Sequence, residues 1–569
     1  MSAVVAGALA PRRVARDRDD WLVLGLLVVF GAYFLFALVL PVGTMLLRSL
    51  QDAGGNFVGL ANYRAYFATP QLLGSIGNSF FVAGLTTAIV LLLAFIYAYA
   101  LTRSRMAFRT FFKVMAFVPL LMPGLLKAIA LVYWFGTQGV LKPVMFGASI
   151  YGPIGIVAAS VLWTFPHAVM ILSTALLLAD ARLYESAEAL KTSRWRTFRF
   201  VILPAVRYGL IATGIFVFVR VLTDFGIPKV IGGNFNVLAT DIYKEVIGQQ
   251  NFAMGAVVSV MLLVPAMAAF VIDRIVTARQ VAQFSARSVP YAPRPTPWFD
   301  RTMFAYCSAI TVLTFAVVGM AQYAALVKFW PYNLQFTLAH YRFDAEGVGW
   351  ENFYNSILLA LVVATAGTVL SFVSAWLVEK PRREQPARQL LHLVALAPMA
   401  IPGLVLGLGF LLFINDPANP LGFLYGTVAL LAISTVSHYY TVVHLTAITA
   451  LKQMDREFES VAASLKVSIL KTFLRVTVPV CVPALLDIWM YLFLNSMTTV
   501  SAVIFLYGVH TKLASIAVIH LDEAGQLASA AAMGMLVVYA CVVVRLLHVV
   551  ASRYLLTRSQ RWRGGAHLG

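Results

Sequence analysis

The chain has 569 residues, of which 60% are hydrophobic and only 12% are charged, and its formal net charge is +19. A soluble globular domain carries about 25% charged residues, so this composition excludes a water-soluble fold and points to lipid as the main solvent. The positive charge does not indicate a nucleic-acid partner, because the basic residues lie in short segments between apolar runs and not on one basic patch.

Uncharged apolar runs follow one another along the chain, and most reach the roughly 20 residues that a membrane-spanning helix needs. The first run, 21–47, exceeds the apolar core of a signal peptide, which has about 7–15 residues, so we expect a retained spanning helix. Two further runs contain a charge, Lys127 in 114–136 and Arg220 after 208–219. Together the runs predict an all-α membrane protein with twelve transmembrane helices, six before residue 280 and six after 300. The uncharged runs are 21–47, 79–101, 154–178, 252–272, 302–327, 352–378, 390–415, 421–450, 488–509 and 524–544.

The Lys and Arg residues indicate the orientation, because cytoplasmic loops carry an excess of them. With a cytoplasmic N-terminus, 33 of the 43 Lys and Arg residues fall in segments on the cytoplasmic side and 8 in loops on the other side. We therefore expect both termini in the cytoplasm.

Three motifs occur twice at nearly the same offset in the numbering. The three pairs are 185–204 with 460–479, 118–125 with 397–404, and Asn78-Ser79 with Asn355-Ser356. The residues of the first pair are 275 positions apart (460 − 185), and we call this spacing the repeat offset. A nearly constant offset indicates two duplicated halves, and an even number of helices in each half makes the repeat parallel. We expect a first repeat over 1–280, a cytosolic linker over 281–300 and a second repeat over 301–569.

The repeated stretches at about 182–204 and 456–479 are basic, although they lie between apolar runs. Apolar and basic residues alternate there with helical spacing, which predicts a short amphipathic helix, a turn and a second short helix ending at Pro204 or Pro479. One such helix could simply lie on anionic lipid. Two copies at a fixed offset, each closed by a proline, favour two equivalent docking sites for a paired cytosolic partner.

Both stretches resemble the EAA loop of type I ABC importer permeases, which has Glu-Ala-Ala, then Gly, then Leu-Pro downstream. Both copies carry Lys at the Gly position, which raises the question of whether the chain bends there as glycine would allow. In the second copy Ser460 occupies the Glu position, beside Glu459. The residues that match the motif or stand in its place are Glu185, Ala187, Leu190, Lys191 and Pro204, and Glu459, Ala462, Leu465, Lys466 and Pro479.

The resemblance covers nearly the whole chain. It implies the type I ABC importer permease (MetI-like) fold, with two parallel six-helix repeats in a bacterial inner membrane. Each EAA loop would be a coupling helix on one subunit of an ATP-binding cassette ATPase dimer, and a periplasmic substrate-binding protein would deliver the substrate, with no second permease needed. The chain has no GxxxxGK[ST] motif, so we expect no enzyme activity, catalytic residue, metal or cofactor in it, and ATP with Mg²⁺ on the partner.

A candidate substrate path lies at the end of the fifth helix of the first half. Arg220 and Asp224 are four residues apart, so we expect them on one helical face, followed by a helix-breaking stretch at 225–233. Charges and broken helices at membrane depth tend to line transport cavities. The equivalent stretch of the second half, 495–501, offers Asn495 and hydroxyl groups but no charge. An Arg–Asp pair that only packs two helices stays open as the alternative.

Other polar residues inside the runs have simpler interpretations. Lys127 is expected to extend toward the outer interface, as long basic side chains do near helix ends. His167, His438 and His444 are expected to be hydrogen-bonded core residues.

The stretch 223–244 and the Ala-Leu-Lys-Thr-Ser form of the first EAA loop resemble the fused double permeases of 2-aminoethylphosphonate importers, a subfamily close to the fused ferric-iron permeases. This resemblance implies 2-aminoethylphosphonate as the substrate, with ferric iron as the alternative. Arg220 would then bind the phosphonate and Asp224 the amine. A proton-coupled secondary transporter is a further alternative, but it leaves the repeated basic helices without a role. A membrane-embedded enzyme or scaffold lacks paired carboxylates or a metal-spaced cluster.

Overall fold

The computed structural model describes residues 17–178, 180–281, 291, 293, 295–343, 347–381, 384–455 and 457–559, so most of the expected linker at 281–300 lies outside the described residues. The first half contains α1 Arg18–Phe34, α2 Leu40–Arg48, α3 Ala61–Ala68, α4 Pro70–Arg103, α5 Arg109–Met115, α6 Gly124–Phe135, α7 Pro153–Leu177, α8 Ala181–Ala189, α9 Arg194–Thr197, α10 Leu203–Leu222, α11 Gly226–Ile231, α12 Leu238–Tyr243 and α13 Phe252–Val281. The second half contains α14 Pro297–Leu326, β1 Val327–Phe329, β2 Asn333–Phe336, α15 Trp350–Glu379, α16 Gln385–Leu396, α17 Gly403–Ile414, α18 Val428–Lys452, α19 Glu457–Ser464, α20 Ile469–Thr472, α21 Val478–Thr498, α22 Ala514–Glu523 and α23 Leu527–Ser559.

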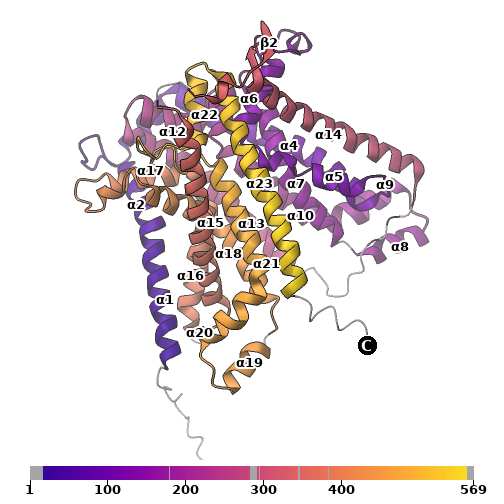
Figure 1. The fold of residues 1–569 in the computed structure, drawn as a ribbon, viewed down its shortest axis with the longest axis vertical. Helices are drawn as coiled ribbons and strands as arrows, with labels where there is room; N and C mark the ends of the chain where they lie inside the picture. Colours follow the sequence, from indigo (N-terminus) through magenta and orange to yellow (C-terminus); the bar gives the residue numbers. More distant parts are fainter. Residues whose placement is uncertain are drawn as a thin grey trace, which may run out of the picture.

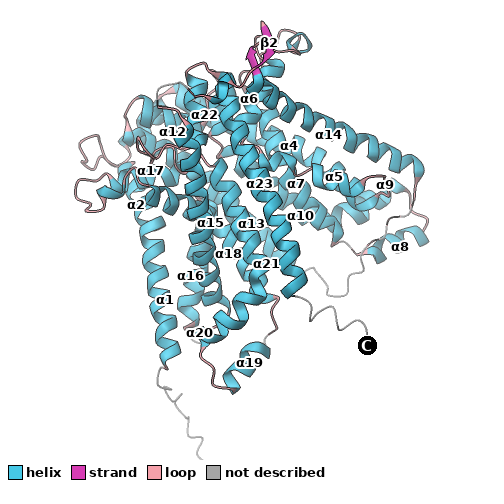
Figure 2. Ribbon diagram, in the orientation of Figure 1, coloured by secondary structure: helices cyan, strands magenta, loops and turns pink. Residues whose placement is uncertain are grey.

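The long helices run side by side through the molecule. Figure 1 shows the hairpin that contains β2 at the top, the short helix α19 at the bottom and the short helix α8 at the right, below α9. Figure 2 shows that helices make up nearly all of the rest. The two strands pair antiparallel. Long apolar helices satisfy their own backbone hydrogen bonds, which is what a lipid environment requires.

Ten helices in the described residues are long and apolar enough to span a membrane, and twelve spans result when each of two bent helix pairs counts as one. The all-α fold with two repeats is therefore confirmed. The prediction of simple spans over 114–136 and 390–415 is wrong. Arg109–Leu121 meets Gly124–Phe135 at 98°, and Gln385–Ala400 meets Gly403–Ile414 at 107°. Pro123 and Pro402, just before these second arms, interrupt the helical hydrogen bonding.

Matching contacts in the two halves reflect the duplication. The Ser79 hydroxyl on α4 accepts a hydrogen bond from the Leu238 N–H at 2.8 Å, where α12 begins. The Ser356 hydroxyl on α15 accepts one from the Ala514 N–H at 2.7 Å, where α22 begins. The same residue type therefore fixes the same short helix to the same long helix in both halves.

The first long helix of each half packs against the other half. On α1, the Tyr33 hydroxyl lies 3.0 Å from the Ser437 hydroxyl of α18, within hydrogen-bond distance. On α14, the Tyr306 hydroxyl donates to the Leu93 carbonyl of α4 at 2.8 Å. The two halves are consequently interlocked by exchanged helices.

Candidate coupling hairpins and central cavity

The repeated basic stretches form two helical hairpins, which we call the first hairpin (residues 180–204) and the second hairpin (457–479). The short helices α8 and α19 both lie away from the hairpin that contains β2, with α19 at the bottom of the view and α8 at the right (Figure 1). The Asp180 carboxylate accepts the Arg182 N–H at 3.1 Å where α8 begins, which satisfies one of the unpaired donors of a helix N-terminus. Each predicted amphipathic helix thus has a counterpart in the structure.

Lys191 and Lys466 form the bends that end α8 and α19. Both have left-handed backbone conformations, with φ of 47° and 54°. The following residue closes the helix in each copy, because Thr192 N–H donates to the Ala187 carbonyl at 3.0 Å and Val467 N–H to the Ala462 carbonyl at 2.9 Å. This is the helix ending that glycine usually provides. The chain therefore bends without the glycine, at a cost of about 1 kcal/mol for each lysine.

The sequence analysis predicted that the second short helix of each hairpin ends at its proline, and this prediction is wrong. The helix runs without a break into the next spanning helix, so that 195–222 and 469–498 are continuous. One widened π-turn precedes each proline, over Phe198–Ile202 and Phe473–Thr477. In these turns the Leu203 N–H donates to the Phe198 carbonyl five residues earlier, and the Val478 N–H donates to the Phe473 carbonyl, also five residues earlier. The widened turn accommodates a proline ring that would clash with the preceding turn of a regular helix.

Each hairpin exposes apolar side chains at matching positions. Leu190 is 77% exposed and Leu465 is 70% exposed, and the repeat offset relates the two. Leu183 and Phe458, which the same offset relates, are exposed as well. Paired exposed apolar patches on otherwise basic segments are typical of surfaces that another protein covers. The buried Ala187 faces the body of the protein instead.

A basic residue at the end of a long helix holds each hairpin, which the sequence analysis did not identify. Lys380 forms an ion pair with Glu459 at 2.6 Å, with the Lys380 side chain 8% exposed. At the equivalent position of the first half, Arg103 donates to the Tyr184 hydroxyl at 3.2 Å and lies over the Tyr184 ring. The spacing from Arg103 to Lys380 is close to the repeat offset and could have revealed the pair. By contrast, the side chain of Glu185 is exposed.

The second hairpin has one further attachment. The Asp19 carboxylate at the start of α1 accepts the Ile469 N–H at 2.7 Å, at the start of α20. A side-chain acceptor at this place satisfies a donor that the first turn of a helix leaves unpaired.

A polar cavity of about 190 Å³ lies between the two halves. The three expected path residues, Arg220, Asp224 and Asn495, all line it. Its other polar or aromatic lining residues include Trp163, His167, Thr223, His438, Tyr439, Tyr491, Thr498, Thr499 and Ser501. The structure therefore brings together the candidate path residues of both halves.

The cavity lining is symmetric in position but not in charge. The repeat offset relates Arg220 to Asn495 and Asp224 to Thr499, and all four line the cavity. The first half thus supplies both charges, and the second half supplies neutral polar groups at the equivalent places.

Arg220 and Asp224 do not share a helical face, which corrects the prediction. The helix α10 ends at Leu222, and the Asp224 carboxylate accepts the Ile227 N–H at 3.1 Å near the start of α11. Among the residues that the structure describes, no ion pair joins Arg220 to Asp224. The Arg220 guanidinium lies over the Trp163 ring, 4.8 Å from its centre. The alternative interpretation, in which Arg220 and Asp224 pair only to pack two helices, is therefore not supported by an ion pair between them.

Lys127 was predicted to extend toward the outer interface, but it lies inside the protein. Its side chain is 1% exposed, and its ammonium group donates to the Met122 carbonyl at 2.6 Å. The bend before α6 turns this arm into the protein core, which the hydropathy of the run could not show.

Two of the three intramembrane histidines differ from the prediction. His167 and His438 both line the cavity, and the Nδ1 atom of each is buried without a hydrogen-bond partner among the described residues. His444 is hydrogen-bonded as expected, with its Nδ1 3.0 Å from the Ser374 hydroxyl. The sequence contained one indication that His438 lines the cavity. The repeat offset relates His438 to Trp163, whose ring lies beneath Arg220.

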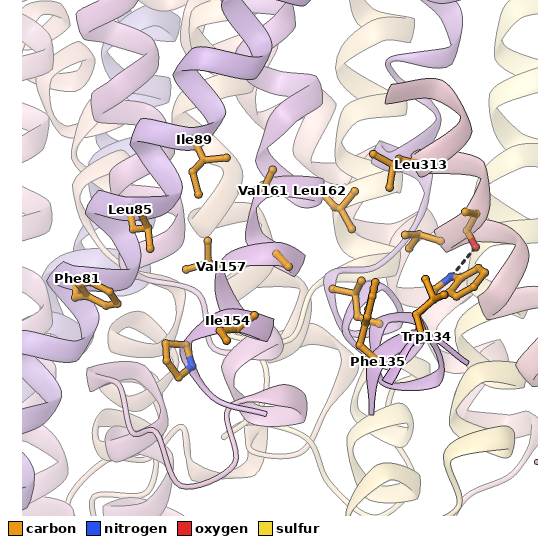
Figure 3. Close-up of a pocket in the computed structure, with 16 residues that line it drawn as sticks. Phe81, Leu85, Ile89, Trp134, Phe135, Ile154, Val157, Val161, Leu162 and Leu313 are labelled. Atoms are coloured by element: carbon orange, nitrogen blue, oxygen red, sulfur yellow. Dashed lines mark hydrogen bonds between the residues drawn. The ribbon is translucent and has the colours of Figure 1, made fainter. Parts of the chain in front are cut away.

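A larger cleft of about 620 Å³ lies among α4, α6, α7 and α14 and is apolar throughout. Figure 3 shows Leu85, Val157 and Leu313 on its walls, with the Trp134 Nε1–H donating to the Ala316 carbonyl at 3.0 Å. It offers no charge or free polar group to a hydrophilic substrate, so the small polar cavity is the better candidate for a transport path.

In the described parts of the chain, no group of three or more His, Cys, Asp and Glu residues is placed to hold a metal ion.

Comparison with known proteins places these features in a family. A family profile described as binding-protein-dependent transport system inner membrane component matches residues 91–281 and 367–555, and each match contains one hairpin. The chain is 28% identical over 479 residues to the ferric transport system permease protein FbpB of Actinobacillus pleuropneumoniae, covering 81% of this chain and 69% of that protein. It is 27% identical over 527 residues to the putative ferric transport system permease protein FbpB 1 of Haemophilus influenzae, covering 90% and 82%. A solved bacterial ABC transporter involved in the import of alginate aligns with a TM-score of 0.39 and 15% identity, over 47% of this chain and 98% of that chain.

Proposed function

The chain belongs to the family of binding-protein-dependent transport system inner membrane components, and from that membership we propose that it is the membrane subunit of an ABC importer for ferric iron. A separate ATPase dimer would bind the two hairpins, and a substrate-binding protein would deliver iron at the opposite end. The Lys and Arg distribution supports a cytoplasmic location for the hairpins and both termini. ATP and Mg²⁺ would bind to the ATPase subunits alone.

The observation that carries this proposal is the continuity of one helix from each hairpin to the central cavity. Residues 195–222 form 28 helical residues that begin in the first hairpin and include Arg220. Residues 469–498 form 30 that begin in the second hairpin and include Asn495. At 1.5 Å per residue the two helices are about 42 and 45 Å long. A displacement of a hairpin would therefore reach the cavity lining through one rigid element.

The coupling mechanism follows from this geometry. Closure of an ATPase dimer would bring the two hairpins together, and the attached helices would tilt and open the cavity on the opposite side. Hydrolysis would separate the ATPase subunits and let the helices return. In this mechanism the exposed apolar residues Leu190 and Leu465 contact the ATPase, and Lys191 and Lys466 fix the angle of each hairpin.

The two permeases of ferric transport systems reported above support iron as the substrate, and they favour it over the 2-aminoethylphosphonate expected from residues 223–244. The repeat boundaries at 1–280 and 301–569, with a linker between them, remain part of the proposal.

Uptake of radioactive ferric iron tests the proposal directly. Cells that express this chain with its ATPase and binding protein should accumulate ⁵⁵Fe³⁺, and deletion of the chain should remove that uptake. Uptake should stop on ATP depletion and persist with a protonophore when ATP is maintained, which separates an ABC importer from a proton-coupled transporter. Chain-dependent uptake of 2-aminoethylphosphonate, without any of iron, would reject the ferric assignment.

A further inference from the structure

At the central cavity, the Arg220 guanidinium has no directly paired acidic group among the described residues. It lines the cavity and lies 4.8 Å from the centre of the Trp163 ring. Within the described residues it forms no hydrogen bond and no ion pair. A guanidinium stacked on an aromatic ring keeps its N–H edge available, and that edge matches the two oxygens of a carboxylate or phosphate.

The acidic residue of the lining, Asp224, attracts Arg220 electrostatically but forms no direct ion pair with it among the described residues. One carboxylate oxygen of Asp224 accepts the Ile227 N–H. Asp224 also has a second basic neighbour, because the buried Lys127 is close enough to attract it electrostatically. Arg220 and Lys127 are thus two basic side chains near one acidic side chain, Asp224. A positive charge inside a membrane protein is costly without a partner, so a mobile anion is a suitable partner.

The rest of the lining fits a small polar guest. His167 and His438 each have a buried Nδ1 without a hydrogen-bond partner among the described residues, one from each half. The volume of about 190 Å³ lies below the roughly 300–1,000 Å³ of pockets for drug-sized ligands. A single small oxyanion suits this size better than an organic chelate.

We propose that the central cavity binds one small oxyanion, of the phosphate or carboxylate class, with Arg220 as the residue that binds it. We also propose that ferric iron crosses together with such an anion and not as a bare cation, a second step that rests on the proposed function. Arg220 repels a bare trivalent cation, whereas the oxygen ligands of a ferric complex can face the guanidinium.

Anion binding to the purified full-length chain in lipid nanodiscs tests the first step. Inorganic phosphate is titrated against chloride at constant ionic strength, with the unfolding temperature as the measurement. The wild-type chain should show saturable stabilisation, and Arg220→Gln should weaken the apparent affinity for phosphate at least tenfold. Arg220→Lys should weaken it several-fold, because lysine keeps the charge but lacks the paired N–H donors of the guanidinium. Arg207→Gln is the matched control, since Arg207 lies on the same helix over the ring of Tyr208 and outside the cavity.

An equal phosphate response in wild type and Arg220→Gln would overturn the site, and so would a response that never saturates, which would indicate an adventitious ion only. If Arg220→Gln does not fold, Arg220→Lys decides alone, and unchanged affinity in that variant counts against the site.

Iron uptake in cells separates the second step from the proposed function. A tenfold loss of ⁵⁵Fe³⁺ uptake in Arg220→Gln, with normal uptake in Arg207→Gln, supports transport of an anion-bound form. Wild-type uptake in Arg220→Gln overturns that step and leaves the ferric importer intact. Saturable phosphate binding in a chain that never supports iron uptake keeps the anion site and rejects the ferric function.

Discussion

The two hairpins share their bends and their exposed apolar positions, whereas the lining of the central cavity differs between the two halves. Both hairpins have a left-handed lysine at the bend, an exposed leucine before it and a π-turn ahead of a proline. In the cavity, Arg220 and Asp224 of the first half face Asn495 and Thr499 at the equivalent positions of the second. Surfaces that bind the subunits of a symmetric motor must stay alike. A cavity shared by both halves needs each chemical group only once.

Loss of both exposed leucines should produce the largest effect. Leu190→Asp combined with Leu465→Asp places two carboxylates on surfaces that we propose to be covered by the ATPase, so we expect ⁵⁵Fe³⁺ uptake to fall at least tenfold while the chain still folds. The single variants should lose similar amounts of activity if the hairpins are equivalent. Val509→Asp, at an 84% exposed position outside the hairpins, is the control. Normal uptake in the double variant would contradict the docking assignment.

Charge reversal should distinguish the two hairpins. Glu459→Lys removes the ion pair with Lys380 and puts two like charges together, so it should lower uptake more than Glu185→Lys, whose side chain is exposed. The loss of stability should be about 1 kcal/mol, as for a partly exposed ion pair. Combining Glu459→Lys with Lys380→Glu restores the pair with reversed polarity and should recover most of the uptake. Failure of this exchange would show that Glu459 acts through the ATPase and not through Lys380.

The pH dependence of stability should reveal asymmetry at the end opposite the hairpins. Burial, reinforced by the nearby Glu523 and opposed by Lys229, raises the pKa of Asp522 on α22 to about 7. Counted from the matched starts of α12 and α22, at Leu238 and Ala514, the equivalent position in the first half is the apolar Val246. An unfolded aspartate has a pKa near 3.9, so the folded chain binds the proton more tightly and is favoured at low pH.

Stability should therefore decline from about pH 4 to pH 7, by on the order of 1–3 kcal/mol from this residue. Asp522→Asn cannot ionise and should remove this part of the decline. Unfolding temperatures of both chains in nanodiscs between pH 5 and 8 give the comparison. Parallel pH profiles of the two chains would exclude Asp522 as a source of the pH dependence.

The smallest effects should come from the bends. Lys191→Gly or Lys466→Gly removes the side chain from a left-handed residue and should stabilise the chain by up to about 1 kcal/mol without changing uptake. Lys471→Gly, within the helix α20, should instead destabilise it by a similar amount. Unequal stabilisation at the two bends would show that the contact of Asp19 with the second hairpin alters its local strain.

The sequence predicted the hairpins well because their signals are local and occur twice. It also identified Arg220 and Asp224 as candidate path residues, because they stand beside a helix-breaking stretch, and Asn495 as one in the equivalent stretch of the second half. It did not predict the bent helices at 109–135 and 385–414, because hydropathy measures the length of an apolar run and not its direction. The histidines of the cavity were missed because His167 and His438 meet only when distant segments pack. Lys127 was misjudged for the same reason, as its burial depends on the bend.

The exchanged first helices have a consequence for how the protein is made. Tyr33 and its hydrogen-bond partner Ser437 are separated by 404 residues. At a synthesis rate of about 5–20 residues per second, α1 must wait roughly 20–80 s in the bilayer before its final neighbour leaves the ribosome. During that interval its polar hydroxyl faces lipid or the insertion machinery. Quality control of the nascent chain therefore has a long window in which α1 is recognisable as an unassembled helix.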